Sequence, residues 1–118
     1  MNPSEMKRRT KSFGLATIRL VETLPKTRTA DVIGKQLLRC GTSVGANYRA
    51  SCRAKSQADF IAKMGIVEEE ADESMYWIDL LVESGLAKKE DLASLSDEAN
   101  QIVAIVVSSI RTAKENRR

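Results

Sequence analysis

Histidine is absent from this chain of 118 residues, which removes the most common general base and the most common metal ligand in proteins. Two cysteines alone cannot complete the four nitrogen and sulfur ligands of a structural zinc site. Catalysis would have to rest on carboxylates, lysine or serine, and no nucleophile–base pair is recognisable. We therefore expect no catalytic residue, no metal and no cofactor, and we expect that the protein is not an enzyme.

Long apolar runs are also missing. The longest, Ile102 to Val107, is far shorter than the ~20 residues that a membrane helix needs, so we expect no membrane partner. The segment from Met1 to Lys11 is polar, and we expect neither a signal peptide nor a transit sequence, hence a cytoplasmic protein. Cys40 and Cys52 would lie about 18 Å apart on one helix, too far for a disulfide. We expect two reduced, packed thiols.

Proline and glycine are scarce, with two and six residues, and helix-forming residues dominate the rest of the chain. Apolar residues recur at three- and four-residue steps, which predicts an all-α fold, an antiparallel up-down-up-down four-helix bundle. Pro25 ends the first helix, Thr29 and Ser56 are expected caps, and Gly85 ends the third helix. No linker or repeat divides residues 1–118, which we expect to form one domain. The helices are expected over about residues 5–23, 29–54, 56–85 and 88–116.

One stretch of the second helix, residues 36–50, carries little side-chain bulk. Gly41 and Gly45 lie four residues apart, hence on one side of the helix. Each glycine costs a soluble helix about 1 kcal/mol relative to alanine, so a tight helix–helix contact is expected to offset that cost. The same spacing occurs in membrane helix dimers, but Arg39, Asn47 and Arg49 exclude a bilayer span. We interpret this face as a closely packed core helix.

The last expected helix has an apolar arc that is wider than one stripe, because Val103 and Ile105 lie beside it. Two interpretations stay open: burial by the bundle and by another subunit, or a well-packed monomeric core. Together with the small-residue face of the second helix, the arc leads us to predict a closed homo-oligomer.

Carboxylates crowd the third helix. They are Glu68, Glu69, Glu70, Asp72 and Glu73. Paired carboxylates in a bundle resemble a di-iron site, but such sites also need a Glu-x-x-His motif, and histidine is absent. The better interpretation pairs some of these carboxylates with Arg39 or Arg49, because a buried charge needs a partner. Tyr76 and Trp77 are interpreted as core or subunit contacts, with base stacking as the alternative.

The charges are unevenly distributed. Residues 1–55 carry twelve Lys and Arg against three Asp and Glu, residues 56–110 carry three against twelve, and the last eight carry four against one. Two interpretations stay open: complementary charge within or between bundles, or a basic patch for nucleic-acid phosphates. The two basic clusters would meet at one end of an antiparallel bundle. The candidate phosphate-binding residues are Lys7, Arg8, Arg9, Lys11, Arg111, Lys114, Arg117 and Arg118.

Several motifs together carry a resemblance to a known family. They are the run Gln-Leu-Leu-Arg…Thr-Ser-Val-Gly-Ala-Asn-Tyr-Arg-Ala over residues 36–50, residues 24–26, 56–64 and 109–114, and Glu70, Ala71, Glu73, Tyr76 and Trp77. At this spacing, which covers nearly the whole chain, the sequence resembles the 23S rRNA intervening-sequence proteins, also called four-helix bundle proteins. The family has no agreed activity.

The resemblance implies more than the residues alone. It selects Glu70 and Glu73 as the carboxylates that form structural ion pairs with Arg39 or Arg49, and it implies a ring-forming homo-oligomer, typically a pentamer. A related branch includes the accessory protein of diversity-generating retroelements, which binds a reverse transcriptase and nucleic acid. By that analogy we expect an accessory protein associated with RNA or DNA. The alternative is a protein-interaction scaffold whose charges serve only its own assembly.

Overall fold

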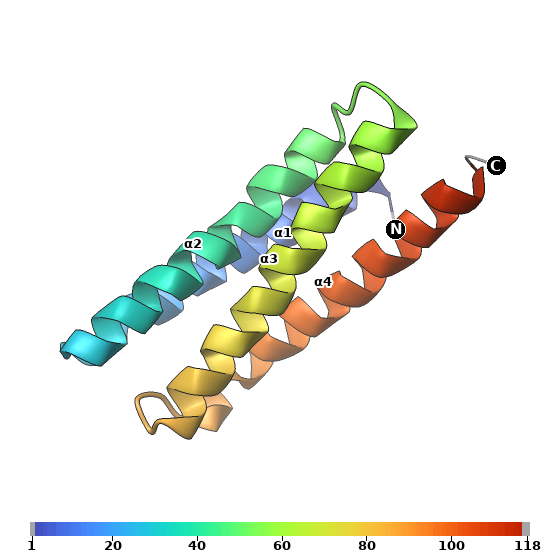
Figure 1. The fold of residues 1–118 in the computed structure, drawn as a ribbon. Helices are drawn as coiled ribbons and strands as arrows, with labels where there is room; N and C mark the ends of the chain where they lie inside the picture. The colour runs from blue at the N-terminus through green and yellow to red at the C-terminus, as the bar shows by residue number, and fades with distance from the viewer. Residues whose placement is uncertain (1, 117–118) are drawn as a thin grey trace.

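The computed structural model of the protein describes residues 2–116. It consists of four helices, α1 (Pro3–Glu22), α2 (Arg28–Ser51), α3 (Gln57–Glu83) and α4 (Lys89–Asn116), joined by short turns. Consecutive helices run antiparallel in a bundle of 50 × 21 × 19 Å (Figure 1). The predicted all-α four-helix bundle is confirmed, and the helix ends lie close to those expected from the sequence.

Capping residues set the helix starts. Asn2 caps α1 and Thr27 caps α2, each through a side-chain oxygen that accepts a hydrogen bond from the backbone N–H three residues on, and Ser56 caps α3 in the same way. The predicted cap at Thr29 is therefore wrong, since the extended backbone that a cap needs occurs at Thr27. Gly85 follows α3 with φ of 80°, a left-handed conformation that favours glycine.

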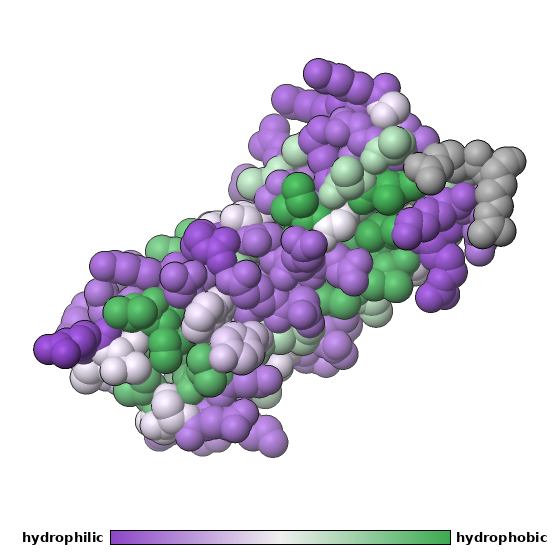
Figure 2. All heavy atoms as spheres, viewed as in Figure 1, coloured by the Kyte–Doolittle hydropathy of each residue, from purple (hydrophilic) through white to green (hydrophobic). Residues whose placement is uncertain are grey.

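One apolar core is shared by all four helices. Its largest fully buried side chains are Phe13 of α1, Leu37 and Val44 of α2, Met64, Val67, Ile78 and Leu81 of α3, and Leu92, Ile102 and Val106 of α4. These positions follow the periodicity read from the sequence, because a helix that packs on one side buries every third or fourth residue. Figure 2 shows that hydrophobic side chains also reach the surface in separate patches between polar residues.

The wide apolar arc of α4 is largely absorbed by its own bundle. Val103 and Ile105 are partly buried and pack against the core. Among the residues that the structure describes, the large hydrophobic side chains that remain exposed lie on the other three helices. They are Leu15 and Ile18 of α1, Val32 of α2, and Ile66 and Tyr76 of α3. The arc of α4 therefore does not identify a subunit contact, and the exposed apolar surface is elsewhere.

Helices α1 and α2 approach each other closely, because glycines face their seam. A Cβ atom added at Gly41 would lie 2.7 Å from the side chain of Thr17, and one at Gly45 would lie 3.2 Å from the backbone oxygen of Thr10. From the other side of the seam, Gly14 faces the backbone of Gly41. The predicted tight contact is confirmed, and it is made within the chain, by α1.

The two cysteines differ in their surroundings, and both are free thiols. Cys40 is buried, accepts a hydrogen bond from the Ser74 hydroxyl at 3.2 Å, and has its pKa raised by burial. Cys52 is exposed, because α2 ends at Ser51 and residue 52 begins the turn to α3. The expectation that both thiols are packed is therefore wrong for Cys52.

The close approach of α1 and α2 predicts opposite effects for two glycine-to-alanine substitutions. Gly41→Ala should lower the free energy of unfolding by about 1–2 kcal/mol, because Thr17 is fully buried and cannot yield without strain. Gly65→Ala should raise it by about 0.5–1 kcal/mol, since a Cβ there meets nothing within 4 Å and alanine favours helix. Urea unfolding followed by circular dichroism measures both free energies of unfolding. A Gly41→Ala variant at least as stable as Gly65→Ala would contradict the packing argument.

Candidate nucleic-acid interface

The six candidate phosphate-binding residues that the structure describes lie on more than one surface of the bundle. The structure places Lys7, Arg111 and Lys114 at the end of the bundle where α1 begins and α4 ends, Arg8 and Lys11 along a groove between α1 and α2, and Arg9 against α4 (Figure 1). Arg117 and Arg118 lie outside the described residues. The start of α1 and the end of α4 do lie at the same end of the bundle, as the antiparallel topology predicts.

A hollow of about 640 Å³, lined by polar and apolar residues, opens at this basic end beside the turn from α2 to α3. Lys7 and Lys55 line it, together with the hydroxyl-bearing residues Ser56, Ser109 and Tyr48. Both lysines are exposed, and within residues 2–116 neither side chain has an ion-pair or hydrogen-bond partner. Lysine, serine and tyrosine side chains are common donors to phosphate oxygens, so the hollow has the chemistry of a phosphate contact.

The end of α4 lies against the start of α3 at the same place. The Gln57 side-chain amide donates to the backbone oxygen of Ala113 at 3.0 Å, which ties the two helix ends together. Arg111 and Lys114 on these last turns of α4 are exposed, and so is Arg53 in the turn after α2. Cations from three parts of the chain therefore lie at this end of the bundle, and two of them, Lys7 and Lys55, line the hollow.

Two of these cations were missed in the sequence. Arg53 and Lys55 lie outside both predicted basic clusters, in the turn between the second and third helices. The up-down-up-down topology already places that turn at the end of the bundle that holds residue 7, and this is the signal that identifies them. The carboxylates near this end are Glu5, Asp59 and Glu115, and Asp59 is engaged with the Lys63 ammonium at 2.7 Å.

A second groove, of about 590 Å³, follows the seam between α1 and α2. Its lining contains Arg8, Lys11 and Arg49, with Leu15 and Ile18 further along α1. Small residues of both helices, Gly14, Thr42, Gly45 and Ala46, also line it and account for its depth. Arg39 and Arg49 were the alternative partners predicted for Glu70 and Glu73; Arg39 forms these pairs, whereas the exposed side chain of Arg49 lies in this groove.

Arg9 is engaged with α4 and does not belong to either basic surface. Its guanidinium donates to both carboxylate oxygens of Glu98 at 2.8 Å and to the Gln101 side chain at 2.7 Å. The hydrogen bond to Glu98 raises the pKa of Arg9, against the effect of burial. This ion pair bridges the first and last helices, and the charge of Arg9 is matched by Glu98.

Arg39 links α2 to α3. Its guanidinium donates to Glu70 at 3.1 Å and also to Glu73, and the Trp77 indole N–H donates to Glu73 at 3.0 Å. The side chain of Arg39 is 50% exposed and that of Glu70 is 15% exposed, so this cluster lies at the edge of the interface rather than in the buried position that we expected. Tyr76 is exposed and packs edge-on against Trp77 with ring centroids 5.2 Å apart.

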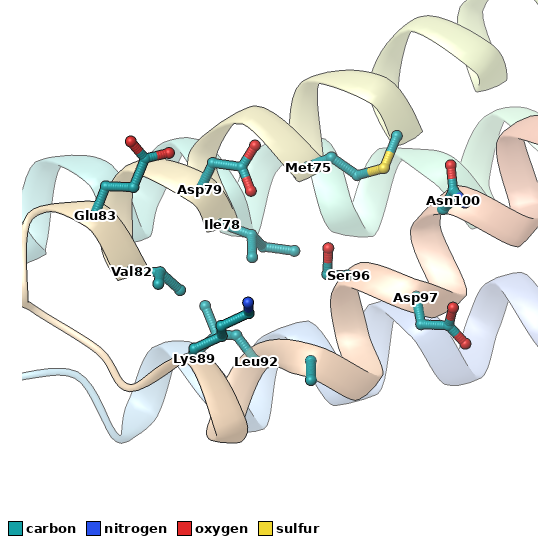
Figure 3. A pocket seen from close by; sticks show the side chains of 11 residues that line it. Met75, Ile78, Asp79, Val82, Glu83, Lys89, Leu92, Ser96, Asp97 and Asn100 are labelled. Carbon is teal, nitrogen blue, oxygen red and sulfur yellow. The ribbon is translucent and has the colours of Figure 1, made fainter.

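A third hollow, of about 560 Å³, lies between α3 and α4 near the opposite end of the bundle (Figure 3). Asp79, Glu83 and Asp97 line it with one basic residue, Lys89, around apolar side chains such as Ile78. This excess of carboxylates disfavours phosphate binding. Among residues 2–116, no three Asp, Glu, Cys or His side chains gather in a way that would hold a metal ion. None of the helices in this part of the chain is long and apolar enough to span a membrane.

Comparison with known proteins agrees with the motifs read from the sequence. The family model described as 23S rRNA-intervening sequence protein matches residues 3–108. The chain therefore belongs to the family of 23S rRNA-intervening sequence proteins, as its motifs predicted. No protein with a curated description matches it.

A solved structure supports the same assignment. It is the crystal structure of a protein with unknown function from the S23 ribosomal protein family of Bacteroides thetaiotaomicron VPI-5482, which is 33% identical to this chain. The match covers 94% of this chain and 99% of the other, with a TM-score of 0.87.

The Arg39 cluster predicts a difference between two neighbouring glutamates of α3. Glu70→Ala should lower the free energy of unfolding by about 1 kcal/mol, because it removes one acceptor from Arg39 in a partly exposed ion pair. Glu68→Ala is the matched control on the same helix, where the partly exposed side chain has no ion-pair or hydrogen-bond partner among residues 2–116, and it should change stability by less than about 0.5 kcal/mol. Identical thermal midpoints for the two variants would show that the cluster adds no stability.

Proposed function

We propose that this protein is a non-catalytic, homo-oligomeric accessory protein that binds RNA or DNA through the basic end of its bundle. The observation that carries the proposal is the hollow lined by Lys7 and Lys55, with Arg53, Arg111 and Lys114 exposed at the same end of the bundle. Among the described residues, the side chains of these five cations make no ion pair. The charge of Lys55 acts, after the hydrogen bonds from Lys63 and from the Lys55 backbone, to lower the pKa of Asp59, and the charge of the other four is available to a ligand.

The chemistry of this end favours phosphate over a specific base. Lysine and arginine side chains bind phosphates as cations, whereas sequence recognition needs contacts to base edges or stacking on aromatic rings. Two aromatic residues line the hollow: Tyr48 is buried, which raises its pKa to about 12, and Phe60 is partly buried and packs against the core. Binding should therefore depend little on sequence. The name of the family refers to an intervening sequence in ribosomal RNA and is consistent with a nucleic-acid context.

A protein-interaction scaffold is the second candidate. It is favoured by the exposed hydrophobic side chains of α1 and α3, which a nucleic-acid backbone does not need. A reverse transcriptase is the protein partner that the resemblance suggests for such a scaffold, and the nucleic-acid proposal is independent of it.

Removal of the basic end should weaken binding to all nucleic acids alike. We expect the wild type to bind single-stranded RNA or DNA of about 20 nucleotides at 50 mM salt, with an affinity that falls steeply as salt rises. Substitution of Lys7, Lys55, Arg111 and Lys114 by glutamine should reduce the log–log salt slope by about one for each residue that contacts a phosphate. Fluorescence anisotropy with two unrelated sequences measures both effects.

The matched control removes the same charge from the other end of the bundle. Lys26, Arg28, Lys88 and Lys89 are exposed there, and their joint replacement by glutamine should leave the slope unchanged. Equal losses of nucleic-acid affinity in both variants would mean that net charge alone drives binding. Absence of binding by the wild type at about 50 mM salt would replace the nucleic-acid proposal by the scaffold.

The proposed homo-oligomer is tested by mass. Size-exclusion chromatography with light scattering, at micromolar concentration, should give a discrete multiple of the 13.0 kDa chain, and the family resemblance favours five copies. The physical reason is the exposed apolar surface of α1 and α3, since side chains such as Tyr76, which is 56% exposed, gain free energy when a second copy covers them. A mass near 13.0 kDa would contradict this part of the proposal.

A further inference from the structure

The outward face of α3 is a regular acidic and apolar stripe. The exposed residues of this helix between Ile66 and Glu83 recur at steps of three and four, which places them on one line facing away from the core. They are Ile66, Glu69, Asp72, Tyr76, Asp79 and Glu83. Within the part of the chain that the structure describes, none of the four carboxylates has an ion-pair or hydrogen-bond partner through its side chain. The stripe contains no basic residue.

The groove between α1 and α2 has the opposite charge and similar apolar character. Arg8, Lys11, Leu15 and Ile18 follow one line along α1, and Arg49 lies opposite them on α2. Leu15 and Ile18 are 43% and 41% exposed. Across the described residues, the three groove cations have no partner for their side chains.

We propose that the stripe on α3 of one copy of this chain docks in the α1–α2 groove of the next copy. Four unpaired carboxylates would face the unpaired cations of the groove, which Lys7 also borders, and the exposed side chains of Ile66 and Tyr76 would cover Leu15 and Ile18. Four of the five exposed large hydrophobic residues thus lie on these two surfaces. The small residues of the groove let a third helix approach closely, because they leave no bulk in its path.

The two surfaces lie on different sides of the bundle, so the contact is head-to-tail. In the view of Figure 1, α3 is in front and α1 lies behind. Each copy therefore presents one groove and one stripe, and repetition of the same contact gives a ring if it closes and a filament if it does not. This inference rests on the homo-oligomer of the proposed function and names the surfaces that would hold it together.

A second copy explains the groove better than nucleic acid does. Phosphates would satisfy Arg8, Lys11 and Arg49, but they would leave Leu15 and Ile18 exposed to water. A helix that carries carboxylates and apolar side chains on one face satisfies both kinds of residue. The proposed docking surfaces do not include Arg53, Lys55 or the last turns of α4, which remain available to nucleic acid.

Charge reversal tests the contact. Arg8→Glu with Lys11→Glu should convert the oligomer to the 13.0 kDa monomer, and so should Asp72→Lys with Asp79→Lys, because each pair sets like charges against each other. The chain that carries all four substitutions should regain the wild-type mass, since its reversed surfaces are again complementary. Size-exclusion chromatography with light scattering gives the masses, and circular dichroism reports the helical fold.

Matched controls reverse charge away from both surfaces. Lys26→Glu with Arg28→Glu, at the turn from α1 to α2, and Glu90→Lys with Asp91→Lys, at the start of α4, alter exposed residues and should leave the oligomer intact. If the wild type is oligomeric and both charge-reversed variants keep the wild-type mass, the proposed contact is overturned and the homo-oligomer is retained. A monomeric wild type overturns both. Loss of RNA binding by the Arg8 and Lys11 variant with its mass unchanged would identify the groove as a nucleic-acid site and also overturn the contact.

Discussion

The absence of side chains at Gly41 and Gly45 is the constraint on which the rest of the structure depends. It lets α1 lie directly against α2, with Thr17 and the backbone of Thr10 in the space that side chains would fill. That approach places the basic face of α1 beside the small residues of α2 and leaves a shallow groove between them. A bulkier pair of residues would separate the helices, and the surface charges of both would no longer share one depression.

Polar contacts then fix neighbouring helices in register. Arg39 joins α2 to α3 through two glutamates, Arg9 joins α1 to α4, and the Gln57 amide joins α3 to the last turns of α4. Each contact lies at the edge of a seam, where one side chain remains in partial contact with water. The core between them is apolar, and it holds no buried side-chain nitrogen or oxygen without a partner among residues 2–116. Specific pairing at the edges is therefore obtained without the cost of a charge in the interior.

The sequence predicts the fold well because helix periodicity is a local signal. The apolar positions from Met64 to Ile78 in α3 recur at steps of three and four, and this periodicity is visible without knowing what the helix packs against. The cap at Asn2 was missed because the stripe begins several residues later, although Pro3 at the first helical position is a recognised sign of a helix start. Gly85 was correctly predicted to end the third helix, because glycine adopts the positive φ of a helix C-terminal cap more readily than other residues.

Charge partners were harder to predict than helices. Arg9 and Glu98 are far apart in the sequence, and no periodicity within either helix connects them. Arg39 and Arg49 are ten residues apart, which turns them about 80° from each other around a helix axis, so the two were never equivalent candidates for the same carboxylates. Lys55 was missed because it belongs to no basic cluster along the chain. The topology assembles the basic end from the start of α1, the turn from α2 to α3 and the end of α4.

The unequal packing of the four helices has a consequence for how the chain folds. Each helix packs along its neighbour in the sequence, while the first and last helices touch over a shorter stretch that Arg9 bridges. Most native contacts are thus formed between segments joined by short turns, which costs little loop-closure entropy and favours rapid folding. Closure of α1 against α4 joins opposite ends of the chain, and it is the step that depends most on the others being complete. The seam between α1 and α4 is accordingly the part of the bundle expected to open first by local unfolding. Amide hydrogen exchange should therefore be fastest along the edges of these two helices that face each other.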